Sequence, residues 1–183
     1  LIFMCGICGQ FRFDSEIVSS KSLTSMMSKL VRRGSDSNGQ WLEGKVGFGH
    51  QRLSIIDLSS NGNQPMIDDI LKLTLVFNGT IYNYKSLRSQ LIGKGYSFFS
   101  HSDTEVIIKA YHCWGEDCVN YLDGMFAFCV WDQTNQKLFI ARDRMGIKPL
   151  YFHLSNKAFT FASNSQALLT QELDKSINPV ALQ

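Results

Sequence analysis

The sequence has no long hydrophobic run. Its longest apolar stretches, such as GMFAFCVW at residues 124–131, are far shorter than the roughly 20 residues needed to cross a bilayer. The opening LIFMCGICG has no basic segment ahead of its apolar residues, which a secretion signal requires. These two absences predict a cytoplasmic protein without a membrane partner.

The sequence also lacks a concentration of charge of one sign. Only 19% of the 183 residues are charged, the formal net charge is +2, and Lys and Arg are scattered. Because a basic patch is the electrostatic footprint of nucleic-acid binding, we expect no nucleic-acid partner. There are only three prolines, and no linker or internal repeat divides the chain. Its length therefore predicts one globular domain.

Short apolar segments bounded by turn residues recur along the chain, and their alternation is typical of half-buried antiparallel strands. We expect strands at residues 7–13, 39–44, 46–56, 71–79, 124–132, 137–143, 150–154 and 158–163. Helical spacing marks residues 15–31, 83–95, 103–114 and 165–173. Strands come in groups, with helices between the groups. This order predicts an α+β fold with antiparallel sheets covered by helices.

Five cysteines, an odd number, favour reduced thiols over a disulfide framework. Cys5 and Cys8 could be half of a zinc site, a redox pair, or one catalytic thiol beside a structural one. A zinc site usually needs a second close pair, and Cys113 and Cys118 are spaced too widely, so we expect no metal. A redox pair normally opens a helix. Here the pair opens a strand-like segment, where residues three apart point to opposite faces, so Cys8 is expected in the core.

Met4 indicates a role for Cys5. If translation starts at Met4, removal of the initiator leaves Cys5 as the amino-terminal residue. A thiol is a weak nucleophile until a base takes its proton, and an α-amine with a pKa of about 8 suits that task better than a lysine with a pKa of about 10. Cys5 would then carry both the nucleophile and the base.

Further motifs follow MCGICG along the chain. They are RRGSDSNGQW, GFGHQRLSIIDLSSNGNQPM, FNGTIYNYKSLRSQL, SDTEVIIKAYHCWG, LDGMFAFCVWD and ARDRMGIKPLYF. In this order they resemble the class II glutamine amidotransferases, in particular the N-terminal glutaminase domain of glutamine-hydrolysing asparagine synthetases, from Met4 to about Leu169. The resemblance implies the N-terminal nucleophile hydrolase fold, a four-layer αββα sandwich of two antiparallel sheets. It also implies hydrolysis of glutamine to glutamate, with ammonia passed to an acceptor in another domain.

The resemblance also implies roles for individual residues. Cys5 resembles the nucleophile, which attacks the side-chain amide of glutamine to give a glutamyl thioester. Asn78 and Gly79 resemble an oxyanion hole, although an NG pair elsewhere is more often a tight turn. Arg52 matches the residue that binds the substrate carboxylate, and Asp103 matches the one that holds its ammonium group. Their ordinary interpretations are a solvated arginine and a helix N-cap.

Ser54 and Thr80 complete the expected substrate-binding set, and Thr80 departs from the family. The family has NGE where this chain has NGT, and Thr80 can accept a hydrogen bond but carries no charge. Loss of one charge-assisted hydrogen bond would weaken glutamine binding roughly ten- to a hundredfold. NGT is also a formal glycosylation sequon, which is the weaker interpretation here.

Two other departures lie at Ser35, where the family has proline, and at Asn164, where it has glutamate. Ser35 is expected to change only the stiffness of its loop. We assign no consequence to Asn164. The histidines match no acid–base role in the family's chemistry and are expected to be structural. They are His50, His101, His112 and His153.

We assign residues 4–172 to the amidotransferase domain and residues 173–183 to the start of a connector. By resemblance, the connector leads to a C-terminal synthetase domain, absent from this sequence, which would use ATP and Mg²⁺; no cofactor is expected in the amidotransferase domain. Residues 1–3 are expected to precede the natural start and to lie over or beside the glutamine pocket. While they and Met4 are attached, Cys5 has no free amine.

Two functions remain open at this point. The first is a glutaminase domain that supplies ammonia to an asparagine synthetase-like domain. The second, motivated by Thr80 and Asn164, is a degenerate non-catalytic domain that serves as a structural or docking module for the synthetase domain. The expected partners are glutamine and that synthetase domain, and a homodimer is left open.

Overall fold

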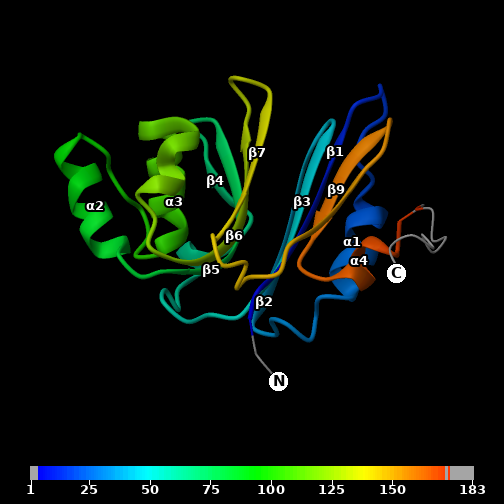
Figure 1. Cartoon of the computed structure of the whole chain (residues 1–183), viewed down its shortest axis with the longest axis horizontal. Helices are drawn as coiled ribbons and strands as arrows, with labels where there is room; N and C mark the ends of the chain where they lie inside the picture. The colour runs from blue at the N-terminus through cyan, green and yellow to red at the C-terminus, as the bar shows by residue number, and fades with distance from the viewer. Residues whose placement is uncertain (1–3, 172, 174–183) are drawn as a thin grey trace.

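The computed structural model describes residues 4–171 and 173, and in this part of the chain two antiparallel sheets lie face to face (Figure 1). The first sheet has the strand order β2-β3-β1-β9-β8, and the second has the order β4-β5-β6-β7. The strands of the first sheet are β1 (Gly6–Arg12), β2 (Ser37–Glu43), β3 (Val46–Arg52), β8 (Tyr151–Leu154) and β9 (Ala158–Ala162). Those of the second are β4 (Met66–Asp68), β5 (Leu73–Ile81), β6 (Gly124–Asp132) and β7 (Lys137–Arg142).

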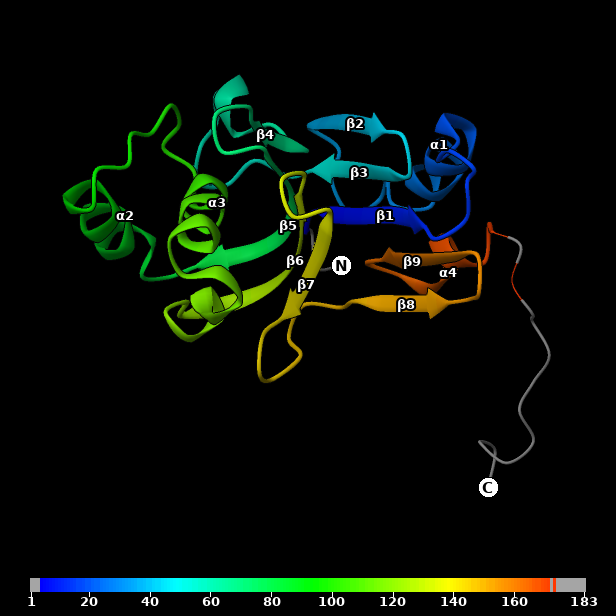
Figure 2. The same cartoon turned by 90° about the horizontal axis from the view of Figure 1, so that it is seen from above.

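Helices cover the outer face of each sheet. The helices are α1 (Ser20–Ser28), α2 (Tyr84–Gly93), α3 (Asp103–Trp114) and α4 (Ser165–Leu168), with 3-10 turns η1 (Ser60–Gly62) and η2 (Gly115–Asn120). α1 and α4 pack on the first sheet, whereas α2 and α3 lie on the far side of the second. Figure 2 shows the same layers from above. The predicted α+β fold, a four-layer αββα sandwich, is confirmed.

Alternation along the strands separates two of the core layers. Ile7 of β1 points between the sheets and packs with Phe48 of β3 and Val76 of β5. Cys8 points the other way and is fully buried against α1, next to Leu23. The prediction that Cys8 belongs to the core is therefore confirmed, and the opposite faces of β1 explain why it is separated from Cys5.

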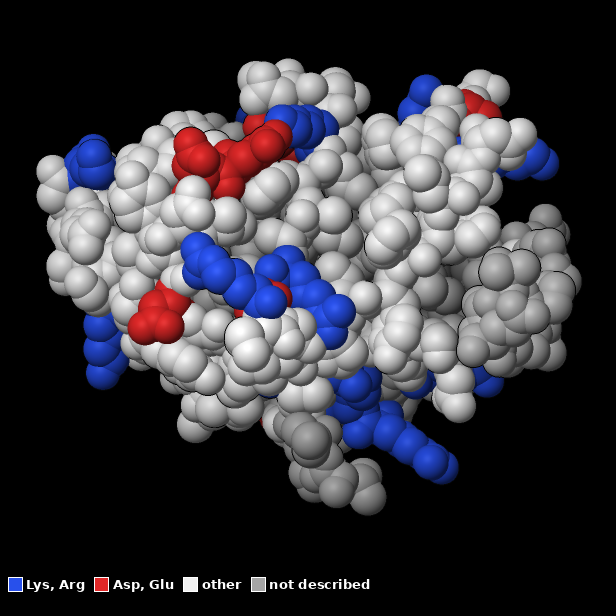
Figure 3. All heavy atoms as spheres, viewed as in Figure 1, with Lys and Arg blue, Asp and Glu red and all other residues white. Residues whose placement is uncertain are grey.

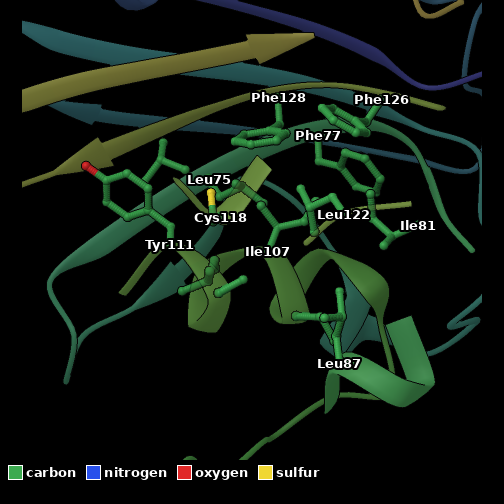
Figure 4. Close-up of a cluster of buried hydrophobic side chains, with 14 of the residues drawn as sticks. Leu75, Phe77, Ile81, Leu87, Ile107, Tyr111, Cys118, Leu122, Phe126 and Phe128 are labelled. Carbon is green, nitrogen blue, oxygen red and sulfur yellow. The ribbon is translucent and has the colours of Figure 1, made fainter. Parts of the chain in front are cut away.

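The third core layer lies between α3 and the second sheet. Ile107 of α3 is fully buried there, and Leu75, Phe77 and Phe128 of the sheet belong to the same cluster (Figure 4). This layer fixes the position of α3 relative to β5. Because Asp103 is the first residue of α3, the same packing sets where its carboxylate lies.

β3 and α4 end earlier in the structure than predicted. β3 ends at Arg52 instead of residue 56, because the N–H of Leu53 turns to Cys5 Sγ (3.3 Å) and that of Ser54 to Asp36 Oδ2 (2.8 Å). α4 covers only residues 165–168 of the predicted 165–173. The hydroxyl of Thr170 donates to the carbonyl of Ala167 (2.7 Å), a local bond that competes with helix continuation.

α1 begins at Ser20, five residues later than predicted, and β4 was not predicted. Before α1, Asp14 Oδ1 accepts the N–H of Glu16 (3.2 Å) and Val18 donates to the carbonyl of Gly44 (2.9 Å), so this stretch is not helical. β4 has three residues, which is too few for an alternating pattern to be recognised. The remaining expected strands and helices are found within a few residues of their predicted limits.

Asn164, to which we assigned no consequence, is the N-cap of α4. Its Oδ1 accepts the N–H of Ala167 (2.8 Å), and its Nδ2 donates to the carbonyl of Lys29 (3.0 Å) at the end of α1. An amide can accept and donate in this way, whereas the family's ionised glutamate can only accept. This departure therefore concerns the contact between α4 and α1.

The surface shows no strong concentration of charge in the view of Figure 3. Basic and acidic side chains form small separate groups among uncharged ones on this face. Among the described residues, none of the helices has the length and apolar character that spanning a membrane requires.

Truncation of the α3 core contact tests this packing. We expect Ile107→Ala to lower the free energy of unfolding by about 2–5 kcal/mol, because it leaves a cavity beneath β5. Ile92→Ala, at a side chain that is 54% exposed on α2, is the matched control and should cost far less. Urea denaturation of both variants measures the difference. Equal losses would contradict the burial of Ile107.

Candidate active site

The register between β1 and β3 brings Cys5 to Arg52. Gly6 pairs with Gln51, so the next pair in the antiparallel ladder is Cys5 and Arg52. By alternation Cys5 shares the face of Ile7, which points between the sheets. These two site residues, which are far apart in the sequence, thus meet at one end of the space between the sheets.

β5 contributes polar groups to the same end of that space. Asn78 and Thr80 share the face of Val76, which packs between the sheets, and Gly79 lies between them in sequence. Further along the strands this layer is filled by apolar side chains such as Phe48. The NG pair therefore lies inside a central strand and is not a turn.

These residues surround a cavity of about 400 Å³, which is within the range of small-molecule sites. All the site residues predicted from the sequence line it: Cys5, Arg52, Ser54, Asn78, Gly79, Thr80 and Asp103. Met4 also lines it, whereas residues 1–3, which we expected beside the pocket, lie outside the described residues. The structure brings the predicted residues together, and their individual roles stay predictions.

The thiol of Cys5 is held by the backbone just beyond β3. Its Sγ accepts the N–H of Leu53 at 3.3 Å. Burial raises the pKa of Cys5 above its ordinary value of 9.0, although the Leu53 N–H and the charge of Arg52 oppose this shift. The thiol is therefore protonated near neutral pH and needs a base before it can act as a nucleophile.

The edge of β5 that faces away from β6 presents a row of N–H groups. Phe77 donates to Gln64 Oε1 (2.6 Å), and Ile81 donates to Asp103 Oδ2 (3.0 Å). Alternate residues of a strand direct their N–H groups to the same edge, so the N–H of Gly79 lies between these two bonds. It borders the cavity that Gly79 lines.

A second donor lies next to the Gly79 N–H. Asn78 is 1% exposed, and its buried Nδ2 has no hydrogen-bond acceptor among residues 4–171 and 173. An unpaired buried donor costs stability, so a group that it can bind in the cavity would recover that free energy. Gly79 itself must be glycine, because a Cβ would lie 2.8 Å from Cα of Phe126 and overlap the carbonyl of Met125.

Arg52 is buried, so its interpretation as a solvated surface arginine is wrong. Its Nη1 donates to the carbonyl of Ser59 (3.0 Å) and to Oδ1 of Asn63 (2.7 Å). Its Nη2 donates to the carbonyl of Asp57. The loop after β3 therefore fixes the guanidinium at the wall of the cavity without neutralising its charge.

Asp103 opens α3 but does not cap it. The N-cap is Ser102, whose Oγ accepts the N–H of Thr104 (3.0 Å). The Asp103 carboxylate instead accepts the N–H of Ile81 on β5. Burial raises the pKa of Asp103 to about 6, despite the backbone hydrogen bonds that oppose it. Asp103 is thus ionised at neutral pH and places a negative charge at the cavity.

Two further polar residues of the cavity, Gln64 and Lys148, were not among the residues predicted from the sequence. Gln64 receives the N–H of Phe77 and donates to Thr104 Oγ1 (3.3 Å), so it ties β5 to the first turn of α3. Lys148 is 5% exposed and lies in the loop before β8. Both stand in quoted motifs, NQPM and IKPLYF, which were the only sequence signals for them.

None of the four histidines lines the cavity within the described chain. His50 is fully buried between the sheets, with Nε2 3.3 Å from the carbonyl oxygen of Phe77. Burial lowers its pKa to about 3, so it is neutral. Residues 4–171 and 173 contain no group of three or more His, Cys, Asp or Glu side chains placed to hold a metal ion.

Two solved structures have this arrangement of sheets. Glutamine phosphoribosylpyrophosphate (PRPP) amidotransferase from Bacillus subtilis superposes with a TM-score of 0.74 and 21% identity, covering 90% of this chain and 43% of that chain. An allosteric regulatory enzyme of purine biosynthesis gives a TM-score of 0.72 at 20% identity, with the same coverage. At these identities the likeness establishes the fold alone.

The chain belongs to the glutamine amidotransferase domain family, whose model matches residues 4–183. Asparagine synthetase [glutamine-hydrolyzing] 3 of Bacillus subtilis is 41% identical over 169 residues, which is 91% of this chain and 27% of that protein. Asparagine synthetase [glutamine-hydrolyzing] 1 of the same organism is 41% identical over 183 residues, 98% of this chain and 29% of that protein. The chain thus spans less than a third of the length of these relatives.

The raised pKa of Asp103 predicts a pH-dependent cost to stability. The folded protein keeps this proton up to about pH 6, whereas the unfolded chain loses it near pH 3.8. Between these values the folded state binds more protons, so its stability falls as pH rises, by about 2–3 kcal/mol for this group. Asp103→Asn keeps an oxygen that can accept the Ile81 N–H, and it removes the loss of stability caused by ionisation of the carboxyl group.

We therefore expect the stability of Asp103→Asn relative to the wild type to increase between pH 4 and pH 7. Urea denaturation at several pH values measures this difference. Asp69→Asn, at an exposed position, is the control and should change little. A difference between Asp103→Asn and wild type that is constant over this pH range would show that Asp103 is ionised throughout.

Proposed function

We propose that this domain hydrolyses glutamine to glutamate and supplies the ammonia to an asparagine synthetase-like domain. The observation that carries the proposal is the meeting of the Cys5 thiol, the Asn78 and Gly79 donors and two opposite charges in one cavity. A nucleophile, an oxyanion site and a site for an amino-acid substrate are thereby combined.

Charge complementarity supports glutamine as the substrate. The α-amino and α-carboxylate groups of an amino acid carry opposite charges, and the cavity has the Asp103 carboxylate and the Arg52 guanidinium at its wall. Because Asp103 is ionised only above about pH 6, binding of the substrate ammonium group is expected to weaken below that pH. At position 80 of the cavity wall the family has a charged glutamate, whereas this chain has the uncharged Thr80.

The proposed reaction begins on a mature chain whose first residue is Cys5. The α-amine takes the thiol proton, and Sγ attacks the amide carbon of glutamine. The oxygen that gains charge is stabilised by the Asn78 amide and the Gly79 N–H, each worth about 3 kcal/mol in comparable sites. The C–N bond then breaks, and the nitrogen leaves as ammonia with the proton that the amine held.

A water molecule completes the proposed cycle. It attacks the glutamyl thioester while the α-amine accepts one of its protons, and the same two donors stabilise the new oxyanion. The C–S bond breaks, glutamate leaves, and the proton returns to Cys5 Sγ. Apart from glutamine and water, no reagent is consumed, so this domain needs no cofactor for the reaction.

The proposal that the ammonia is used by a synthetase domain is based on the similar proteins. Both Bacillus subtilis proteins are named glutamine-hydrolysing asparagine synthetases, and each is more than three times as long as the segment it shares with this chain. We infer a C-terminal synthetase domain that consumes ammonia with ATP and Mg²⁺. Its connector would start in residues 173–183, of which only Leu173 is among the described residues.

Replacement of the proposed nucleophile tests the reaction. In a chain that begins at Cys5, verified by mass spectrometry, we expect Cys5→Ala to lower glutamate release by more than roughly a thousandfold. Cys8→Ala is the matched control, because Cys8 lies on the other face of β1, and it should keep activity while losing some stability. Glutamate release by Cys5→Ala at the wild-type rate would refute the proposal.

The alternative function, a non-catalytic module, predicts a different result in the same experiment. It predicts that the wild-type chain beginning at Cys5 releases no glutamate but still binds its synthetase domain. The buried, unpaired Asn78 amide favours the catalytic proposal, because a docking module gains nothing from that cost in stability.

Restoring the family's charge at Thr80 tests the binding proposal. Thr80→Glu should lower the KM for glutamine roughly tenfold or more, since it restores a charge-assisted contact to the substrate amine. Thr80→Gln, which has the same length without the charge, is the control. Steady-state kinetics of the two variants would contradict the charge argument if their KM values were the same.

A further inference from the structure

A buried lysine next to Cys5 has no carboxylate partner. Lys148 is 5% exposed, and its Nζ donates to Sδ of Met4 at 2.9 Å. A thioether is a weak acceptor. Among the described residues Lys148 takes part in none of the ion pairs, which join Arg12 to Asp14, Lys109 to Asp68 and Glu105, and Lys137 to Glu116. An unneutralised buried cation is costly, so its position calls for an explanation.

A second cation reaches the same point of the chain. Arg33 Nε donates to the carbonyl oxygen of Cys5 at 3.0 Å, and the carbonyl of Arg33 accepts the N–H of Met4 at 3.0 Å. The Nη2 of Arg33 is buried without a hydrogen-bond partner in the described part of the chain. Arg33 therefore binds the backbone on both sides of the Cys5 nitrogen and brings a second positive charge to it.

The loop before β8 holds Lys148 in place. The N–H of Lys148 donates to Asp143 Oδ2 (3.0 Å), and its carbonyl accepts Arg142 Nε (2.6 Å). Asp143 also accepts the N–H groups of Phe126 and Ile147, so its carboxylate is engaged by backbone donors. The charge of Lys148 is therefore presented by a fixed loop and not by a mobile surface chain.

The charged groups that face Cys5 are predominantly positive. Arg33, Arg52 and Lys148 are cations, and Asp103 is the anion that acts on the thiol in the opposite sense. A positive field disfavours an ammonium group and favours a thiolate. An unperturbed α-amine has a pKa of about 8 and would be mostly protonated at neutral pH, when it cannot act as a base. Neighbouring cations lower the pKa of the α-amine, so that a larger fraction of it is neutral and can act as a base.

We propose that Lys148, assisted by Arg33, is a positioning residue that keeps the α-amine of a mature Cys5 in its neutral, base-competent form and lowers the proton affinity of the adjacent thiol. The proposal rests on the proposed function, in which the α-amine takes the thiol proton. Removal of Met4 takes away the thioether that Lys148 contacts, and it leaves the new amine on the residue whose carbonyl oxygen Arg33 binds.

The test compares the pH dependence of wild-type, Lys148→Met and Lys148→Arg chains that begin at Cys5. For Lys148→Met we expect the acid limb of kcat/KM for glutamine to move to higher pH, with a loss of about tenfold at pH 6.5 that shrinks to less than about twofold at pH 9. Lys148→Arg retains the charge and should keep the wild-type limb. Lys45→Met, at an exposed position in the turn between β2 and β3, controls for loss of one positive charge elsewhere.

A second measurement separates this proposal from the proposed function. The rate of Cys5 alkylation by iodoacetamide, followed against pH without glutamine, reports the ionisation of the residue whether or not the chain hydrolyses glutamine. Lys148→Met should shift this profile to higher pH as well. Wild-type chain that releases no glutamate would refute the glutaminase proposal alone.

Two results would overturn the role of Lys148 itself. One is an alkylation profile of Lys148→Met that coincides with the wild-type profile. The other is a loss of activity that is equal at all pH values, which would show a purely structural effect. Thermal unfolding of each variant identifies misfolding. If Lys148→Met is misfolded, the test rests on Lys148→Arg, and a shift of its acid limb to higher pH would contradict the proposal.

Discussion

The antiparallel register between β1 and β3 is the constraint on which the cavity depends. It sets Cys5 against Arg52 and turns the thiol toward the space between the sheets, while Cys8 is turned into the α1 layer. A slip of one residue would exchange these faces and bury Cys5 against α1. The pairing is in turn secured by Ile7 and Phe48 in the layer between the sheets, so the core and the candidate site are set by one alignment.

Burial gives this site its chemical character. The same exclusion of water raises the pKa of Cys5 and of Asp103 and lowers that of Lys148. Arg52 and Asp103 are held by uncharged groups and not by an opposite charge: Arg52 by carbonyls of the loop after β3 and by the Asn63 side chain, and Asp103 by the N–H of Ile81. Charges held in this way remain available to a zwitterionic substrate, and the cost of desolvating them is borne by the surrounding packing.

Much of this arrangement could be predicted from the sequence because it follows from short-range patterns. Alternation located the strands and separated Cys5 from Cys8, whereas the site candidates Arg52, Asn78 and Asp103 came from the resemblance to the amidotransferases. Contacts between distant segments could not be predicted in this way. The bonds from Gln64 to Phe77 and Thr104, and the approach of Lys148 to Met4, join residues whose separation along the chain carries no periodic signal. β4 could not be predicted because a strand of three residues is too short to show an alternating pattern.

The positions of Asn164 and Thr80 in the structure show that these two departures from the family have different consequences. Asn164 caps α4 and bonds to the end of α1, so it bears on packing at a distance from the cavity residues. Thr80 lines the same cavity as Asp103, at the position where the family has a glutamate. In the proposed function, loss of that charge weakens substrate binding but leaves the thiol, the Asn78 amide and the Gly79 N–H unchanged. For the proposed function, the choice between a catalytic and a docking role therefore concerns substrate affinity, because Cys5, Asn78 and Gly79 all line the cavity.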